Sequence, residues 1–161
     1  GNIIQRAYAQ KNYFPIRYMF ADPINQKGWQ IYSANMLLDA GYDKLDVSYE
    51  ILLLKEQLMI ASMGFVEGEY YSANISRKDA ISYLREEAFL NISEAENLLL
   101  QSDLIFFSGT QAFIGMLEVE SLRKEYEINS GENFNLFQFH QEFLKHGIIP
   151  FYQLKRMVLT L

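Results

Sequence analysis

The sequence predicts an all-α fold, a single-domain helical bundle of about seven to eight helices that includes one long central helix. Apolar residues recur at helical spacing along most of the 161 residues, and half of the residues are hydrophobic. No stretch alternates apolar and polar residues with period two, and no Asn-Gly hairpin is present. A chain of this length can bury one substantial core, so we expect residues 1–161 to form one domain.

The first half of the chain is predicted to hold three helices. Apolar spacing favours a helix over residues 3–13, which Pro15 ends. After a turn at Asp22-Pro23, a second helix runs to Gly41 and carries Trp29, Tyr32, Met36 and Leu37 on one face. The longest helix begins at Asp46 and continues for about seven turns. Its periodic apolar residues are Val47, Ile51, Leu54, Leu58, Ala61 and Phe65.

Capping residues mark the helices of the second half. The Ser76 hydroxyl can cap a helix, and Ser93 to Glu96 reads as a capping box. We expect the apolar run that follows to stop at Gly109, with a helix restarting over residues 112–127 and a loop over 130–133. Asn135 can cap a helix over 136–145 that Gly147 closes, and Pro150 is placed as the first residue of a last helix to Leu161.

Composition excludes several classes of function. With a net charge of −6 and a pI near 4.9, the chain lacks the clustered Lys and Arg that bind a nucleic acid. It has no cysteine, which excludes disulfides and thiolate metal sites. No apolar run is long enough to span a membrane. The compartment, cytoplasmic or exported, stays open. Because the chain starts at Gly1 without a methionine, we expect upstream residues to have been removed.

Few residues indicate catalytic chemistry. His140 and His146 lie six residues apart and therefore on different helix faces, so we predict no metal site built from both. We interpret His140 as a packed histidine hydrogen-bonded to backbone, in preference to a catalytic base, and His146 as a residue at the negative end of a helix. Acid pairs that include Glu67 are assigned to the surface. The turn over residues 108–111 is typical of an anion site but has a single glycine, so it receives little weight.

Several segments together resemble the C-terminal part of a bacterial family known as domain of unknown function 885. They are residues 114–123, 134–140 and 147–150, with residues 75–84 and the helix of Gly28-Trp29 falling where that family has similar segments. The resemblance covers nearly the whole chain. It implies a helical, zinc-dependent metallopeptidase scaffold of the gluzincin type, with a His-Glu pair, a second His one helical turn later, and a Glu directly before the Gly-Trp.

By this resemblance the metal-site positions have been lost. Lys27 stands before Gly28, and Asn2 stands in the place of the second histidine. A zinc site needs three protein ligands and an open position for a water, and a lysine cannot replace a carboxylate ligand. Other polar positions of the family are replaced by Ile60, Met63, Tyr71, Ala112 and Phe113. We therefore expect no bound metal or cofactor, whereas zinc is the family's cofactor.

Two functions remain open, beside a plain structural subunit. The first is a non-catalytic metallopeptidase-like domain, a pseudoenzyme, that binds a peptide, a protein partner or a second copy of itself. The residues proposed to line its cleft are Trp29, Tyr32, Tyr71, Gln111 and His140. The second is the C-terminal half of a zinc-dependent hydrolase whose metal site is completed by upstream residues. A homodimer is one way to cover an apolar surface left open.

Overall fold

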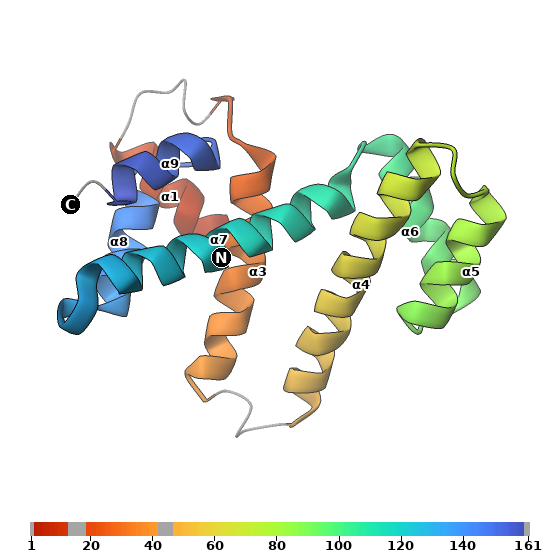
Figure 1. The fold of residues 1–161 in the computed structure, drawn as a ribbon, viewed down its shortest axis with the longest axis horizontal. Coiled ribbons are helices and arrows are strands. Elements are labelled where there is room, and N and C mark those ends of the chain that lie inside the picture. Colours follow the sequence, from red (N-terminus) through yellow and green to blue (C-terminus); the bar gives the residue numbers. More distant parts are fainter. Residues whose placement is uncertain (1, 13–18, 42–46, 160–161) are drawn as a thin grey trace. The chain divides into compact units, whose positions relative to one another are not determined.

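The fold is all-helical, as predicted. The computed structural model describes residues 2–12, 19–41 and 47–159, and within them it contains eight α-helices, one 3₁₀ turn and no strand (Figure 1). The elements are α1 (Asn2–Asn12), α3 (Pro23–Asp39), α4 (Val47–Tyr71), α5 (Arg77–Glu87), α6 (Ile92–Leu104), α7 (Ser108–Ser130), η2 (Gly131–Asn133), α8 (Leu136–Lys145) and α9 (Phe151–Leu159). Among these, α4 is the longest, as its periodic pattern indicates.

The helices divide into two compact units, and the single-domain assignment stays a prediction. Unit 1 comprises residues 1–34 and 114–161, and unit 2 comprises residues 35–113. The two boundaries fall inside α3 and α7, so each of these helices contributes to both units. Each unit has a hydrophobic cluster of its own. None of the described helices combines the length and the apolar character that a membrane crossing requires.

Unit 1 is built around aromatic side chains. Helices α1 and α9 both contact α8, whose Phe139 and Phe143 are fully buried. A buried polar link also joins elements that are distant in sequence. The Gln5 side-chain amide donates to Asn25 Oδ1 at 2.8 Å, and the Asn25 amide donates to the Ile149 carbonyl at 2.6 Å. These hydrogen bonds between neutral groups link α1 to α3 without burying a charge, although the buried Gln5 Oε1 accepts no hydrogen bond.

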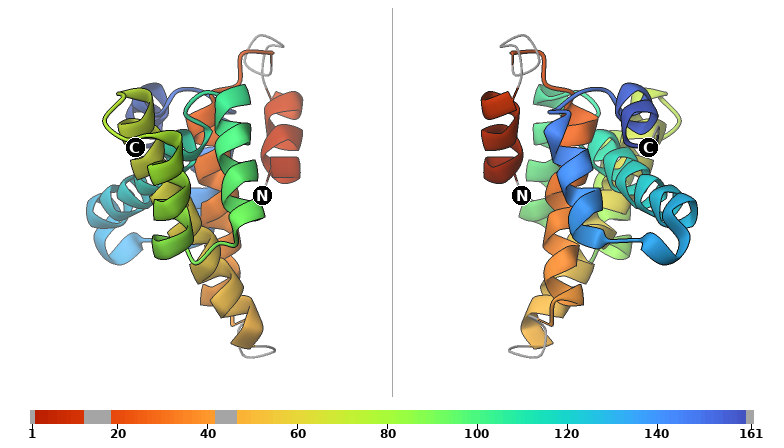
Figure 2. Two further views of the ribbon diagram at one scale, coloured as in Figure 1. Left: turned by 90° about the vertical axis from the view of Figure 1, so that its right-hand side faces the viewer. Right: turned by 90° about the vertical axis from the view of Figure 1, so that its left-hand side faces the viewer.

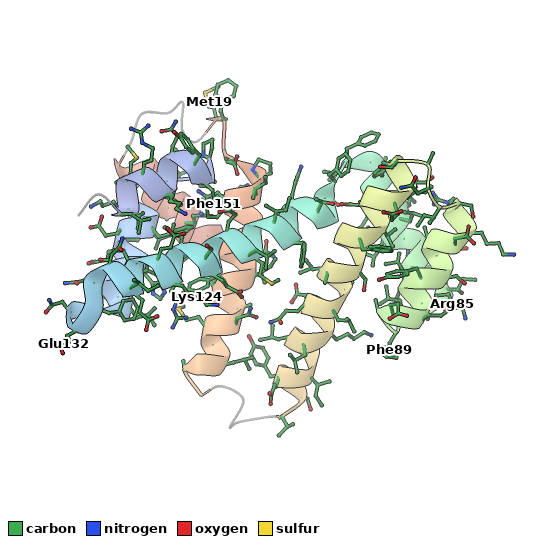
Figure 3. The ribbon with its side chains drawn as sticks, in the orientation of Figure 1. Met19, Arg85, Phe89, Lys124, Glu132 and Phe151 are labelled. Atoms are coloured by element: carbon green, nitrogen blue, oxygen red, sulfur yellow. The ribbon has the colours of Figure 1, made fainter. Side chains whose placement is uncertain are left out.

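Unit 2 contains α4, α5 and α6, which run alternately up and down beside one another (Figures 1 and 2). Its core is aliphatic, with several alanines that let the helices approach closely. The core residues are Met63, Val66, Ala80, Leu84, Ala88, Leu90, Ala95 and Leu99. Helix α5 ends in a left-handed residue, Phe89, whose side chain is exposed and points away from the helices (Figure 3). A β-carbon is unfavourable in that conformation, so this helix end carries strain.

Two of the predicted helix boundaries were wrong. Helix α6 is capped by Asn91, which accepts from the Glu94 amide at 2.9 Å while the Glu94 carboxylate accepts from the Asn91 amide at 2.8 Å. Ser93 therefore lies inside the helix, because Asn is as effective an N-cap as Ser and stands at the correct spacing from Glu94. Gly109 does not break a helix either. It lies in the first turn of α7, which begins at Ser108.

The predicted caps Ser76 and Asn135 agree with the structure, and the predicted turn at Asp22-Pro23 contains a further cap. The Asp22 carboxylate accepts from the Asn25 amide at 2.8 Å, so Pro23 begins α3 and Asp22 caps it. Ser76 forms a capping box with Asp79, whose pKa is lowered by hydrogen bonds from the Ser76 hydroxyl and amide. Asn135 caps α8, and the Pro150 carbonyl accepts the first hydrogen bonds of α9, which starts one residue later than predicted. Tyr13 and Leu161, the predicted ends of the first and last helices, lie outside the described residues.

Candidate functional site

The position of α3 in unit 1 is fixed by two glycines that bring backbones into contact. A β-carbon at Gly28 would lie 2.3 Å from the Gly115 carbonyl oxygen of α7, and one at Gly115 would lie 2.2 Å from the Ile24 carbonyl oxygen. No side chain fits at either position, because both obstacles are backbone atoms. This backbone contact therefore also fixes the position of Lys27, the residue directly before Gly28.

Trp29 and Tyr32 meet His140 and Phe143 of α8 in one aromatic cluster. The Trp29 ring stacks on Phe143 with centroids 4.8 Å apart, and it meets the His140 ring edge-on at 5.7 Å. The Tyr32 hydroxyl and His140 Nε2 are 2.9 Å apart and hydrogen-bonded. The structure thus brings together three of the residues predicted to line a cleft. Trp29 and Tyr32 are buried core residues, and only His140 is partly exposed.

His140 is held in its neutral form. Burial lowers the pKa of the imidazole below its ordinary value of 6.5, and the positive charge of Arg123 lowers it further. The Arg123 guanidinium lies 5.9 Å from the centre of the Tyr32 ring, in cation–π range. The prediction of a packed histidine agrees with this geometry, but the partner identified here is a phenol rather than backbone. His140 thus packs in the aromatic cluster of unit 1 with its Nε2 hydrogen-bonded to the Tyr32 hydroxyl.

The other unit 1 positions singled out from the sequence are more peripheral. Lys27 is partly buried on α3. Asn2 is the first residue of α1, and its side chain lies outside the described residues. His146 is the C-cap of α8, as its position before Gly147 suggests, with Nε2 3.8 Å from a Glu142 carboxylate oxygen. His140 and His146 contact different groups, in line with their spacing.

In unit 2, the assignment of Glu67 to the surface was wrong, because this carboxylate is completely buried. Its Oε1 accepts from the Ser102 hydroxyl at 2.6 Å and the Gly109 amide at 2.9 Å. Its Oε2 accepts from the Thr110 amide at 2.6 Å and the Thr110 hydroxyl at 2.8 Å. Three of the four donors belong to Gly109 and Thr110 at the N-terminus of α7, and together the four donors satisfy the carboxylate. The turn over residues 108–111 does hold an anion, which is the chain's own carboxylate.

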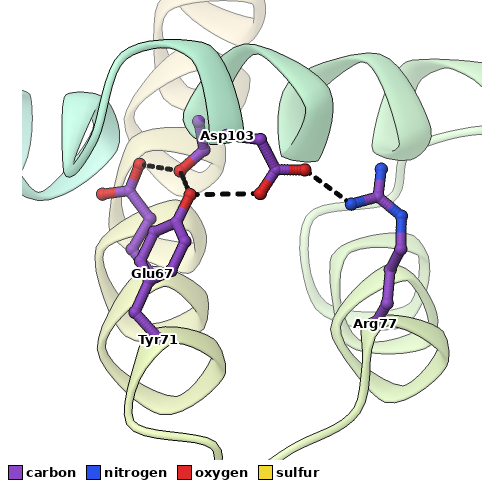
Figure 4. A network of polar contacts seen from close by, with 5 residues as sticks. Glu67, Tyr71, Arg77 and Asp103 are labelled. Carbon is purple, nitrogen blue, oxygen red and sulfur yellow. Dashed lines mark hydrogen bonds and ion pairs between the residues drawn. The ribbon is translucent and has the colours of Figure 1, made fainter.

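Tyr71 extends this network from the interior to the surface (Figure 4). Because the Ser102 proton is given to Glu67, the Tyr71 hydroxyl shares its own proton between Ser102 Oγ at 3.0 Å and Asp103 Oδ1 at 3.3 Å. The second Asp103 oxygen pairs with Arg77 Nη1 at 2.7 Å. Burial, with the negative charges of Asp103 and Glu67, raises the pKa of Tyr71.

The network joins α4, α6, α7 and the start of α5, and its chemistry is structural. Each Glu67 oxygen already accepts two hydrogen bonds, so this carboxylate has no lone pair left to bind a metal or to take a proton from a substrate. Gly109 is required here, since a β-carbon would lie 2.5 Å from the Met63 β-carbon. Tyr71 belongs to this network and not to the His140 cluster. Gln111, one residue beyond Thr110, donates to the Phe106 carbonyl at 3.4 Å.

Two further positions that the resemblance marks as altered, Ile60 and Met63, are buried apolar residues of α4. Ala112 and Phe113 are half-buried on α7. Across the part of the chain that the structure describes, no group of three or more His, Cys, Asp or Glu side chains is arranged to hold a metal ion.

The fold is similar to two solved bacterial structures. One is "a putative lipoprotein of unknown function" from Shewanella oneidensis, with a TM-score of 0.90 and 24% identity, matched over 99% of this chain and 29% of that chain. The other is "the putative lipoprotein" from Colwellia psychrerythraea, with a TM-score of 0.84 and 24% identity, matched over 89% of this chain and 24% of that chain. This chain thus spans less than a third of either structure.

No curated protein matches the sequence. Residues 1–158 match the family model described as "Bacterial protein of unknown function (DUF885)". This match covers nearly the whole chain and agrees with the resemblance drawn from the sequence segments. The chain therefore belongs to the DUF885 family of bacterial proteins of unknown function.

Proposed function

We propose that this chain is a non-catalytic, metallopeptidase-like helical domain that binds a peptide or protein partner. The observation that carries the proposal is Lys27, the residue directly before Gly28. The resemblance assigns this position to a metal-ligating glutamate. The contact of Gly28 with Gly115 holds α3 in register, so a neighbouring residue cannot slide into the position of Lys27.

A lysine here does not fit a zinc ligand set. Zinc in a peptidase is bound by three neutral or anionic ligands, which leave one position for a water. An ammonium group donates hydrogen bonds and has no lone pair, and its positive charge repels a divalent cation. Replacing the glutamate by lysine changes the local charge by two units, which disfavours zinc beyond the loss of one ligand.

The other ionisable groups of the two sites support the same conclusion. The Nε2 atom of His140 is hydrogen-bonded to the Tyr32 hydroxyl, and the Glu67 carboxylate is satisfied by four donors. Both groups stabilise their own unit. Ionisable groups that stabilise the fold, with none left available for catalysis, are what we expect of a non-catalytic scaffold.

A groove in unit 2 supports the partner-binding half of the proposal. It lies between α4 and α6 and encloses about 500 Å³. Leu52, Met59, Leu90 and Leu98 supply apolar surface, while Lys55, Glu56, Glu94, Asn97 and Gln101 supply polar groups. A concave surface of this size with mixed lining suits a short peptide segment better than a highly charged ligand.

The second candidate is the C-terminal half of a zinc-dependent hydrolase whose metal site is completed by residues outside this sequence. The observation that favours it is the coverage of the solved relatives, since this chain matches only 29% and 24% of their lengths. Most of such a protein would lie elsewhere. This alternative predicts that zinc binds despite Lys27.

Metal analysis of the purified chain tests the first candidate, and the second requires the same analysis on a protein that includes the residues outside this sequence. Elemental analysis and titration calorimetry with zinc would be performed on the unmodified chain, on Lys27→Glu and on Lys78→Glu. Lys78 is an exposed residue of α5 and controls for the change of charge. We expect no stoichiometric zinc in the unmodified chain or in Lys78→Glu. One tightly bound zinc in the unmodified chain would overturn the proposal. Zinc in Lys27→Glu alone would identify Lys27 as the group that excludes the metal.

A further inference from the structure

Helix α4 has two apolar faces, and only one of them is buried. The buried face contains Leu53, Ile60, Met63 and Val66. The other face consists of the α4 seam, which we define as Val47, Ile51, Leu54 and Leu58, and it continues to Phe65, whose ring stacks on Tyr83 of α5. The side chains of these five residues are between 39% and 67% exposed. The prediction that they belong to one helix is confirmed, but they are not the side that the helix buries.

The spacing of the residues in the α4 seam indicates that a second helix packs against it. The intervals of four, three and four residues are those of a heptad repeat, with Val47 and Leu54 at d positions and Ile51 and Leu58 at a positions. Such a seam interlocks with the side chains of a second helix, whereas a strand or a loop has a different period. A β-branched residue at a, followed by leucine at d, favours two parallel strands. Ile51 with Leu54 is this combination, whereas Val47 at d and Leu58 at a are not.

Charges beside the α4 seam identify the second helix. Glu50 occupies a g position and Lys55 the following e position, and both are exposed. Neither has an opposite charge three or four residues away in its own helix, where Lys55 meets only Ile51, Leu52, Leu58 and Met59. In a parallel pair of identical helices, a g residue faces the e residue five positions further along the other chain. Glu50 of each copy would therefore face Lys55 of the other. Two-fold symmetry gives two such ion pairs per dimer.

We propose that the α4 seam binds the α4 seam of a second copy of this chain in a parallel, two-fold symmetric coiled coil. The symmetry closes the assembly at two chains. An antiparallel arrangement would pair g with g and e with e, and would not bring Glu50 to Lys55. At Gln57, the next g position, the seam is bordered by the end of α3, since the Gln57 amide donates to Asn35 Oδ1 at 2.8 Å. The inference stands whether or not Lys27 excludes a metal.

Charge reversal tests both the partner and the orientation. In Lys55→Glu each ion pair becomes a repulsion between glutamates, and in Glu50→Lys a repulsion between lysines. Each variant should dimerise about tenfold more weakly than the unmodified chain by sedimentation equilibrium at low salt. The double variant Glu50→Lys/Lys55→Glu should recover the original affinity. An equimolar mixture of the two single variants should form a heterodimer, because all of its cross-chain pairs are attractive.

A disulfide reports the orientation independently, because the chain has no cysteine of its own. In a parallel coiled coil the two copies of a d residue face each other across the symmetry axis, so Leu54→Cys should form a cross-linked dimer under mild oxidation. Lys78→Cys, on exposed α5, is the control and should remain monomeric on a denaturing gel.

Three results would overturn the proposal. One is an unmodified chain that stays monomeric up to about 1 mM, because its dimer would then bind more weakly than even a low-affinity complex. Another is a dimer whose affinity the two charge reversals leave unchanged. The last is equal cross-linking of Leu54→Cys and Lys78→Cys. Circular dichroism of every variant establishes that it is folded, which the exposed positions of Glu50 and Lys55 favour.

Discussion

The two units of this chain use different means to hold helices together. The core of unit 1 is rich in large rings that interlock, namely Trp29, Tyr32, Tyr126, Phe139, Phe143 and Phe151, and its buried polar residues, Gln5 and Asn25, are neutral. The core of unit 2 is made of aliphatic and alanine side chains, and it buries the carboxylate of Glu67 beside Ser102. Small side chains bury less apolar area per residue, so we infer that unit 2 depends more on its polar network.

The units also differ at their left-handed backbone positions. Within the described residues, those of unit 1 are glycines, Gly131 and Gly147. Those of unit 2 include Ala73, Phe89 and Phe107, which have β-carbons. A left-handed residue with a β-carbon is disfavoured by roughly 1–2 kcal/mol. Unit 2 therefore has more strain at its turns, in addition to its dependence on a buried charge.

The largest effect is expected from removing the buried carboxylate. Glu67→Gln should destabilise unit 2 by about 3–5 kcal/mol, because the amide group that replaces one oxygen faces buried donors and cannot accept from them. Chemical denaturation followed by circular dichroism measures this loss. Trp29 is the only tryptophan and lies in unit 1, so its fluorescence reports that unit separately. If the units unfold independently, the fluorescence transition should stay in place.

The matched control for Glu67 is Glu69→Gln. Glu69 lies on the same helix and accepts from the Asn74 amide at 3.1 Å in an exposed setting. This substitution should change stability by less than about 0.5 kcal/mol. Equal effects of the two substitutions would contradict the role that we assign to the buried network.

A glycine substitution should have its greatest effect in unit 1. Gly28→Ala forces the backbones of α3 and α7 apart, because its β-carbon would lie 2.3 Å from the Gly115 oxygen, and we expect a loss of about 3 kcal/mol. Gly68→Ala in α4 has nothing within 4 Å of its added carbon and should stabilise the helix by about 0.5–1 kcal/mol. Denaturation midpoints by Trp29 fluorescence for the first variant and circular dichroism for both measure these shifts. A harmless Gly28→Ala would refute the close backbone contact.

Changes at the left-handed positions should have opposite signs in the two units. Phe89→Gly should stabilise unit 2 by about 1 kcal/mol, whereas Phe89→Ala, which keeps a β-carbon, should be close to neutral. Gly131→Ala should destabilise unit 1 by about 1 kcal/mol, since its φ of 52° is unfavourable for alanine although its surroundings are open. Thermal unfolding of the three variants tests the signs, and a stabilising Gly131→Ala would contradict the strain argument.

The smallest effect is a pH dependence confined to unit 1. Burial lowers the folded-state pKa of His140 below 6.5, so the stability that the neutral ring provides is present above pH 6.5 and is lost as the pH falls through the folded-state pKa. Trp29 fluorescence during denaturation at pH 7.5 and pH 5 should show this loss, and His140→Gln should reduce it. NMR titration of His140 gives the pKa directly. A pKa above 6.5 would contradict the cause that we assign.

Local patterns predicted most of the helices because their causes act over about four residues. Helical periodicity, the caps at Ser76 and Asn135, and the stop at Gly147 are set by the chain itself. Even so, the same rules placed the capping box at Ser93 when Asn91 was the cap, since two cap candidates two residues apart each preceded an acid at the correct spacing. Periodicity also identified the α4 seam without revealing that it is exposed, because period alone does not say which neighbour covers a face.

The sequence by itself thus determined the helical class and most helix ends, and it showed that a lysine stands directly before Gly28. Only the tertiary structure decided which polar groups are buried and which residues meet. Glu67 meets its donors 35 to 43 positions away, and Tyr32 meets His140 at a separation of 108. The turn over residues 108–111 has the pattern of an anion-binding site, but a single sequence could not reveal that the anion bound there is the Glu67 carboxylate. The physical reason is that burial of a charge depends on donors supplied by distant segments, whereas a helix is stabilised largely by its own neighbours along the chain.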